Sequence, residues 1–471
     1  MPRTHVTLHN SAHALRAGFE RIRARFGVTT GFPQPVEVAA AASRAREFER
    51  ADHRPLAFIT IDPQGSRDLD QAFHAEPVKG GGYRVHYAIA DVAAFVDADD
   101  VVSREALKRG ETVYLPDERA PLYPYSLGEG KASLLPGEDR PALVWTIDLD
   151  QHGDLTDAKV ERSVIHSRRA LSYQFVQKAL ETNRASREMH LLEEIGRARQ
   201  AIEEARGGIS LNLPSQDIVR HGDQYLLEFR APLPVEGWNA QISLLTGIAA
   251  ARIMVDGGAG LLRTLPSVDG DDVAHLRRIA TSLRLDWPED LTYAQFVRRC
   301  DARTGAGAAF LTEAAHTLRG AGYVPWHGNG TPPAHGALAS VYAHVTAPLR
   351  RLADRYANEI VLALCAGKPI PEWAISELDQ LPEVMAASKR RGQDIERASI
   401  DLVEAAVLSN QVGRTFEAMV VERRGERIVI HIAEPAIVTT LPADHVEPGG
   451  HLTVRLDAAD PTNGTITFSV T

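Results

Sequence analysis

The chain has 471 residues, of which 44% are hydrophobic and 24% are charged, which is ordinary for a globular protein of two or three domains. It shows no apolar run of about 18 residues and no secretory signal pattern. Its two cysteines, Cys300 and Cys365, exclude a disulfide framework and a cysteine-rich zinc site. We therefore expect a cytoplasmic protein without a membrane span. The formal charge of −10 excludes a uniformly basic nucleic-acid binder but allows a local basic groove.

Residues 1–54 are predicted to form a short, basic helical region. They contain nine arginines against five acidic residues, and the stretches 12–26 and 37–51 have helical spacing or high helix propensity. The segment between them, GVTTGFPQP, interrupts the helical pattern. A helix-turn-helix-like unit and an arm that packs on the main domain fit this pattern equally well.

From residue 55 the pattern changes first to strands and then to helices, which predicts one large α+β domain over 55–405. The expected strands and hairpin, from their β-branched and aromatic content, lie at 56–61, 83–96, 143–150, 159–167 and 209–229. The expected helices, from their 3.6-residue periodicity, lie at 172–180, 187–206, 238–255, within 271–320, at 341–366 and at 374–410.

Residues 412–471 are predicted to form a separate all-β unit. They contain five short alternating stretches divided by turn signals at RRGE, EPGG and DPTNG. That number and spacing of strands is typical of a small five-stranded barrel of the oligonucleotide-binding (OB) kind.

Three aspartates follow the first strand of the large domain, in FITIDPQGSRDLDQAF (58–73). Asp68 and Asp70 share a face if the stretch is extended, and a proline and a glycine turn the chain so that Asp62 can lie beside them. Crowded carboxylates need compensation, from a divalent cation such as Mg²⁺ or from an arginine such as Arg67. These residues alone support a metal site and a solvated acidic loop about equally.

A second stretch, HGALASVYAHVTAPLRRLADRYANEI (335–360), places arginines at a loop-to-helix junction. Pro348 is a helix-start signal, and the free N–H groups of a helix start together with Arg350 and Arg351 make a phosphate site. The alternative is a surface helix with ordinary intrahelical pairs, such as Arg350 with Asp354.

Together these stretches resemble the RNB catalytic domain of the RNase II family of hydrolytic 3′-to-5′ exoribonucleases. The first family motif, approximately I-D-x-x-x-[ST]-x-D-x-D-D-A, is IDPQGSRDLDQAF here, and the late motif, Y-x-H-[FV]-T-S-P-I-R-R-Y-x-D, is YAHVTAPLRRLAD. The segments HYAIADVAAFV and YLPDERAPLYPYSLGEGKASLLPGEDRPAL match the family between them. The resemblance implies a mixed sheet flanked by helices at 55–405, and the barrel at 412–471 resembles the S1 RNA-binding domain.

The resemblance also implies roles for individual residues. Asp62, Asp68 and Asp70 match the family's metal-site acids, Asp70 being the one regarded as essential for cleavage, and Gln71 stands at the place of a fourth acid. Arg350 matches the catalytic arginine near the scissile phosphate. The residues that match positions on the RNA path are Tyr114, which stacks on bases at the 3′ end, and Tyr173, Arg351, His344, Thr346 and Glu236.

The chain departs from the family pattern at several of these motifs. An amide at position 71 brings no charge, so metal affinity is expected to fall unless the amide oxygen serves as an additional ligand. The other departures are Ala347 for a serine, Leu352 for a tyrosine, Asn358 for a histidine, and Gly237 and Ser243 for a glutamate and an asparagine.

From the resemblance we expect Mg²⁺-dependent hydrolysis of single-stranded RNA from its 3′ end to nucleoside 5′-monophosphates, by a monomer with one or two Mg²⁺ ions or Mn²⁺ in their place. The alternative is a catalytically weakened RNA-binding protein on the same scaffold, which Gln71 favours. A regulator that binds DNA through the basic N-terminal helices is supported only by their arginines.

Overall fold

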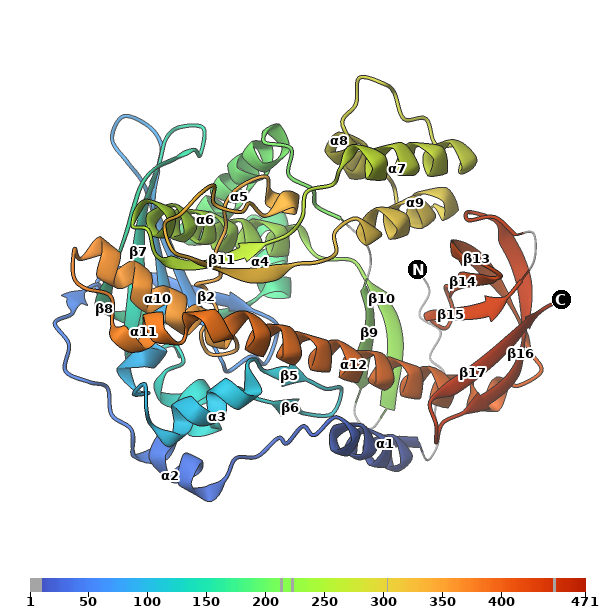
Figure 1. The fold of residues 1–471 in the computed structure, drawn as a ribbon, viewed down its shortest axis with the longest axis horizontal. Helices are drawn as coiled ribbons and strands as arrows, with labels where there is room; N and C mark the ends of the chain where they lie inside the picture. The colour runs from blue at the N-terminus through green and yellow to red at the C-terminus, as the bar shows by residue number, and fades with distance from the viewer. Residues whose placement is uncertain (1–10, 212–214, 222–223, 303, 444–445) are drawn as a thin grey trace.

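The computed structural model describes residues 11–211, 215–221, 224–302, 304–443 and 446–471 (Figure 1). It confirms the expected α+β class: a mixed sheet with helices packed around it, a helical N-terminal segment, and a C-terminal five-stranded barrel. The long helix α12 (Leu381–Leu408) runs from the helices beside the sheet to the barrel and contacts both (Figure 1).

The large sheet has the strand order β1–β8–β2–β3–β4–β7 and curls back on itself. Strand β8 (Leu155–Ser172) pairs antiparallel with β7 (Asp139–Leu149) and then parallel with β2 (Phe58–Asp62). Strands β4 and β7 are buried along most of their length because helices and loops cover both faces. The remaining strands of this sheet are β1 (Ala51–Asp52), β3 (Gln71–Pro77) and β4 (Tyr83–Ala90).

Helix α6 (Pro234–Asp256) is apolar on most of its surface and lies in the main core, as such a helix must. At Gly247 the chain segment 342–343 approaches so closely that a Cβ would lie 2.5 Å from the carbonyl oxygen of Ala343. This close approach seats the loop that precedes α10 on the helix. The other helices around the sheet are α3 (Val101–Arg109), α4 (Tyr173–Glu181), α5 (Arg187–Ala205), α10 (Leu352–Cys365) and α11 (Glu372–Ser376).

A smaller core holds three further helices together. Trp287 stacks on Phe296 with ring centroids 4.5 Å apart, and Phe310 meets both rings edge-on. The helices are α7 (Gly270–Ser282), α8 (Tyr293–Arg299) and α9 (Gly305–His316), and the short strands outside the main sheet are β5 (Val113–Tyr114), β6 (Arg119–Ala120), β9 (Ser215–His221), β10 (Gln224–Arg230), β11 (Gly260–Thr264) and β12 (Gly322–Trp326).

The N-terminal segment packs on the body of the protein. Helix α1 (Ser11–Arg25) buries Phe19 against α12 and Tyr225, and α2 (Gln34–Ala42) packs on α3. This arrangement fits a packing arm better than a helix-turn-helix unit. The helix expected over 37–51 ends at Ala42, because the chain beyond it is held extended: Arg46 donates its N–H to Ala94, and Arg46, Arg50 and Arg162 lie around the ring of Phe48.

The C-terminal unit is the expected five-stranded antiparallel barrel, nearly closed, with the order β15–β14–β13–β16–β17. Its interior is filled by alternating apolar residues, including Val420, Ile430, Leu456 and Phe468. The strands are β13 (Thr415–Arg424), β14 (Arg427–Ile432), β15 (Ile437–Pro442), β16 (His451–Asp460) and β17 (Thr465–Val470). No helix among the described residues is long and apolar enough to cross a membrane.

Glu404 on α12 makes stability depend on pH. Its Oε1 accepts hydrogen bonds from Gln216 (2.7 Å) and from the N–H of Val438 (3.1 Å), and burial raises its pKa from 4.5 to about 7. Because the folded state then binds the proton more tightly than the unfolded state, the free energy of unfolding falls as pH rises from 4.5 to 7, by at most about 3 kcal/mol.

We expect Glu404→Gln to flatten the pH dependence of stability and to raise the free energy of unfolding at pH 8. The amide keeps an acceptor for both donors and cannot ionise. Urea unfolding at pH 5 and pH 8 measures the effect, with Glu396→Gln on the exposed side of the same helix as control. Parallel pH profiles of Glu404→Gln and the native chain would contradict it.

Candidate active site

The three aspartates lie around the connection from β2 to β3. Asp62 is the last residue of β2, and Asp70 directly precedes β3, where its carbonyl accepts the N–H of Ala90. The hydroxyl of the buried Ser133 accepts the N–H of Leu69 (2.9 Å) and donates to the carbonyl of Arg67 (2.6 Å). This anchor holds the loop so that Asp68 and Asp70 flank a buried leucine.

Burial dominates the electrostatics of two of these carboxyl groups. It raises the pKa of Asp62 to about 7, with the carboxylate of Asp68 adding to the shift and Arg350 opposing it. It also raises the pKa of Asp70 well above its usual value, against the effect of Arg350 and of a hydrogen bond from Leu349. Asp62 Oδ2 is buried and has no hydrogen-bond partner. A buried, unpartnered carboxylate oxygen beside two further carboxylates fits a site for a hard cation.

Arg350 reaches this cluster from a segment far away in the sequence. The N–H of Leu349 donates to Asp70 Oδ1 (2.7 Å), and Arg350 Nε lies 3.6 Å from Asp70 Oδ2. The Arg350 side chain is 42% exposed, so its guanidinium faces both the carboxylate and solvent. The helix expected over 341–366 begins only at Leu352, which leaves Pro348 and Arg350 in the loop before it.

Asp68 has two partners on the tyrosine–proline loop. Tyr114, 54% exposed, donates its hydroxyl to Asp68 Oδ2 (3.4 Å), and Arg119 donates to Asp68 Oδ1 (2.9 Å). Arg119 also pairs with Glu129, which in turn lies 3.8 Å from Arg67. The sequence reasoning missed Arg119, although it lies in the quoted loop, and the compensating arginine of Asp68 is Arg119 instead of the expected Arg67.

Both ends of the amide of Gln71, the first residue of β3, are hydrogen-bonded. Its Oε1 accepts a hydrogen bond from the hydroxyl of Tyr87 (2.6 Å), and its Nε2 donates to the carbonyl of Thr346 (2.6 Å). The carbonyl can only accept, so the amide nitrogen must face it and the amide cannot be flipped. Gln71 therefore braces β4 against the loop that carries Arg350.

Two other positions at which the chain departs from the family motifs hold the same loop. Ser243 on α6 donates to Thr346 Oγ1 (3.0 Å), and Asn358 on α10 donates its amide to the carbonyl of Val345 (2.9 Å). Gln71, Ser243 and Asn358 thus all form hydrogen bonds to residues 345–346 of the loop that carries Arg350.

Thr346, which is buried, and Arg351, which is half-buried, are parts of this framework. Arg351 forms a bidentate pair with Asp354 (2.9 and 2.8 Å), whose Oδ2 also accepts the N–H of Ala347 (2.7 Å). Thr346 is 4% exposed and uses its hydroxyl and its carbonyl inside the protein. Thr346 is thus closed off from solvent, whereas Arg351 is half-buried and pairs with Asp354.

The remaining predicted residues lie at different depths. His344 Nδ1 is 2.7 Å from the hydroxyl of Tyr323, and burial lowers its pKa well below the usual value, with Arg351 and other arginines adding to the shift. Burial, and next the carboxylate of Asp62, raises the pKa of Tyr173, whose hydroxyl accepts a hydrogen bond from Asn239 (3.3 Å). Glu236 accepts the N–H of Leu233 (2.9 Å) and pairs with Arg230 (2.7 Å), so it caps the start of α6.

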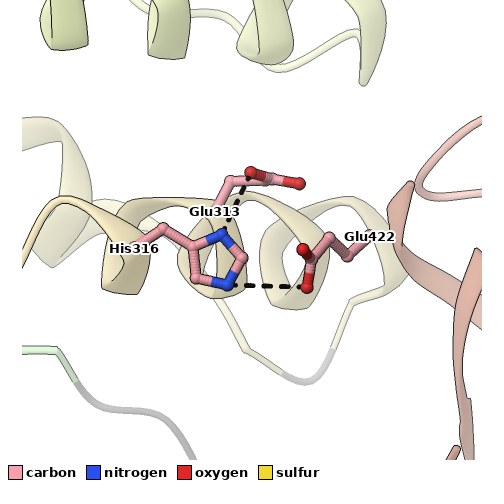
Figure 2. A group of neighbouring side chains, drawn as sticks. All are labelled: Glu313, His316 and Glu422. Carbon is pink, nitrogen blue, oxygen red and sulfur yellow. Dashed lines mark ion pairs between the residues drawn. The ribbon is translucent and has the colours of Figure 1, made fainter. Parts of the chain in front are cut away.

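A second cluster joins α9 to the barrel. Figure 2 shows the ring of His316 between two carboxylates: Nδ1 lies 3.6 Å from Glu313 and Nε2 lies 3.5 Å from Glu422 on β13. Among the described residues, only this triad brings three potential metal-binding atoms within 4.8 Å of one another, so the three aspartates are spaced more widely. Arg424 already donates hydrogen bonds to both oxygens of Glu422 (2.5 and 2.6 Å). The cluster therefore fits a group of ion pairs that connects α9 to the barrel.

Family models match most of the chain. A model described as the RNB domain matches residues 50–367, and one described as the RNase II-type exonuclease C-terminal S1 domain matches residues 414–471. The chain is 27% identical to a ribonuclease R of Vibrio cholerae over 437 residues, which are 85% of this chain and 52% of that relative. It thus spans about half the relative's length.

Solved structures share the fold. A Mycoplasma genitalium RNase R in complex with ribose-methylated single-stranded RNA superposes with a TM-score of 0.86 at 20% identity, covering 97% of this chain and 78% of that one. Yeast Ssd1, described as a pseudonuclease, superposes with a TM-score of 0.72 at 18% identity, covering 92% and 56%. At these identities the likeness concerns the fold.

Proposed function

The chain belongs to the RNB-domain family, and on that premise we propose that it is a hydrolytic exoribonuclease that shortens single-stranded RNA from the 3′ end to nucleoside 5′-monophosphates. The observation that carries the proposal is the meeting of Asp70 and Arg350, which come from segments far apart in the sequence and are joined by the hydrogen bond from Leu349 to Asp70. An acid cluster, a half-exposed arginine and an exposed tyrosine converge at one point of the surface.

We propose that Asp62, Asp68 and Asp70 hold the divalent cation, Mg²⁺ or Mn²⁺. The unpartnered oxygen of Asp62 and the purely oxygen donor set support a hard cation. A bound cation at this position would lower the pKa of a water molecule and neutralise charge on the phosphate. Gln71 is not among the proposed ligands, because its amide carries no charge and already joins Tyr87 to the carbonyl of Thr346.

The chain's own residues position the RNA for hydrolysis. The Tyr114 ring is exposed and suited to stack on a base whatever its identity, as degradation of any sequence requires. The guanidinium of Arg350 stabilises the negative charge that develops on the attacked phosphate. The Leu349 N–H fixes Asp70 beside Arg350, so that the acid and the arginine keep their relative positions when RNA binds.

The second candidate is an RNA-binding protein with weakened catalysis. It is supported by the uncharged Gln71 and by the structural likeness to Ssd1, described as a pseudonuclease. We favour the enzyme, because the three aspartates and Arg350 are all present and converge, and the amide at position 71 has a bracing role of its own.

Incubation with 5′-labelled single-stranded RNA tests the proposal. With Mg²⁺ or Mn²⁺ present at pH 8, we expect the protein to shorten the RNA stepwise to a short end product. At this pH Asp62, with its pKa of about 7, is ionised. The same reaction with EDTA should leave the RNA intact. A stable shifted complex without shortening under both conditions would overturn the enzyme in favour of the binder, and RNA-like binding of matched DNA would point to the DNA-directed alternative.

A further inference from the structure

A recess opens beside the proposed active site and carries excess positive charge. It has a volume of about 250 Å³. We call it the anion recess and define it by six of its lining side chains: Glu111, Tyr114, Arg263, Arg350, Arg351 and Lys389.

The cations of the anion recess are poorly compensated. Glu111 is the one carboxylate among its lining residues, and Arg351 is engaged by Asp354 behind it. Arg263 and Lys389 take part in none of the ion pairs among the described residues; Arg263 lies over the ring of Tyr323 instead, 4.7 Å from its centroid. Two half-buried cations outside any ion pair, with Glu111 as the one carboxylate near both, leave the recess with a net positive charge that suits an anion.

The ionisation of neighbouring groups agrees with this excess. Burial lowers the pKa of Lys389, the positive charge of Arg263 lowers it further, and the carboxylate of Glu111 opposes both effects. Burial likewise lowers the pKa of His344, with Arg351, Arg263 and Arg350 each adding to the shift. The part of this shift that the three arginines cause indicates a positive potential, which a bound phosphate would relieve.

The position of the anion recess indicates which phosphate group of a bound RNA could reach it. Its wall includes both Tyr114, proposed to stack on the terminal base, and Arg350, proposed to face the scissile phosphate. Arg263 on β11 and Lys389 on α12 come from other elements and supply charge beyond what the scissile phosphate needs. An RNA that ends in a 3′-hydroxyl has no charged group to place beside them.

We propose that the anion recess binds a phosphate group on the 3′-terminal nucleotide, and that RNA ending in a 3′-phosphate is a preferred substrate. This inference rests on the proposed function. Water attacks the last internucleotide phosphorus, the bond from phosphorus to the O3′ of the penultimate nucleotide breaks, and that oxygen takes up a proton. The terminal nucleotide then leaves as a nucleoside 3′,5′-bisphosphate, and the shortened RNA ends in a 3′-hydroxyl.

Two 5′-labelled oligoribonucleotides of one sequence, with 3′-hydroxyl and 3′-phosphate ends, test the inference. For the first cleavage by the native chain we expect a kcat/KM about tenfold higher for the 3′-phosphate end, the scale of one charge-assisted hydrogen bond. Chromatography should identify nucleoside 3′,5′-bisphosphate as its first product. Lys389→Gln and Arg263→Gln should each reduce the preference and leave the rate on the 3′-hydroxyl end unchanged, whereas Lys368→Gln at an exposed position should do neither.

Three outcomes would overturn the inference. One is equal rates on the two ends, or a block at the 3′-phosphate. Another is an equal loss on both substrates in Lys389→Gln and Arg263→Gln, which would assign the cations to an internal phosphate. The third is equal affinity for the two RNAs in EDTA. Tighter binding of the 3′-phosphate RNA in EDTA without any cleavage in Mg²⁺ would keep the anion recess and overturn the exonuclease instead.

Discussion

Asp70→Asn should lower the rate of RNA hydrolysis by about a thousandfold or more, the scale on which charged groups at a reaction centre act. The carboxylate lies 3.6 Å from Arg350 and is one of the three proposed cation ligands, so its charge is needed for both. The asparagine oxygen can still accept the N–H of Leu349, and a buried amide is cheaper to fold than a buried carboxylate. We therefore expect folding and RNA binding to persist.

Gel analysis of labelled RNA measures the rate, and a mobility-shift titration measures binding. Asp99→Asn, at an exposed aspartate remote from the cluster in sequence and contacts, is the matched control and should behave as the native chain does. Undiminished hydrolysis by Asp70→Asn would remove Asp70 from the site. Loss of binding together with hydrolysis would show that Asp70 chiefly maintains the loop.

Gln71→Asp should weaken the protein, although it restores the acid of the family motif. Aspartate has no N–H to donate to the carbonyl of Thr346, and its charge would face that oxygen across a buried contact. Leaving a buried partner unsatisfied costs about 1–3 kcal/mol. We expect the free energy of unfolding to fall by that amount and the hydrolysis rate to fall about tenfold, because the loop carrying Arg350 loses its brace.

Urea unfolding and the Mg²⁺ dependence of hydrolysis test this prediction together. Gln151→Asp in an exposed turn introduces the same charge without touching the brace. Should Gln71→Asp hydrolyse RNA faster and need less Mg²⁺, position 71 is an unfilled ligand position and the bracing role is wrong. Asp91 is an acidic residue that could be considered in place of a fourth cation ligand at position 71. It is a poor candidate, because Arg50 and Arg162 pair with its buried carboxylate.

Local patterns predicted much of the fold. The barrel strands were predictable because alternation and turn residues act within a few positions of each other. The helix over 37–51 was predicted too long, because propensity favours helix there while Arg46 and Arg50 find partners in distant segments. The start of α10 was likewise predicted too early, since the residues before Leu352 are held by contacts with Gln71, Ser243 and Asn358.

The candidate site likewise has residues that the sequence could predict and residues that it could not. The aspartates lie in one contiguous motif, so a resemblance could point to them. Arg119 and the engagement of Gln71 arise only when separate segments fold together, and no spacing in the sequence reveals either one. The anion recess is a still stronger case, because Arg263 and Lys389 lie over a hundred positions apart and belong to no motif.

The packing of α1 bears on the order in which the chain matures during synthesis. Its apolar face meets α12, where the Cβ of any larger residue at Gly18 would collide with Leu402. At about 5–20 residues per second, the ribosome takes roughly 20–80 s to make the chain between them. Until then the apolar face of α1 lacks its contact with α12 and can meet only earlier segments such as that of Tyr225, so a nascent-chain chaperone can bind this face while the intervening chain is made.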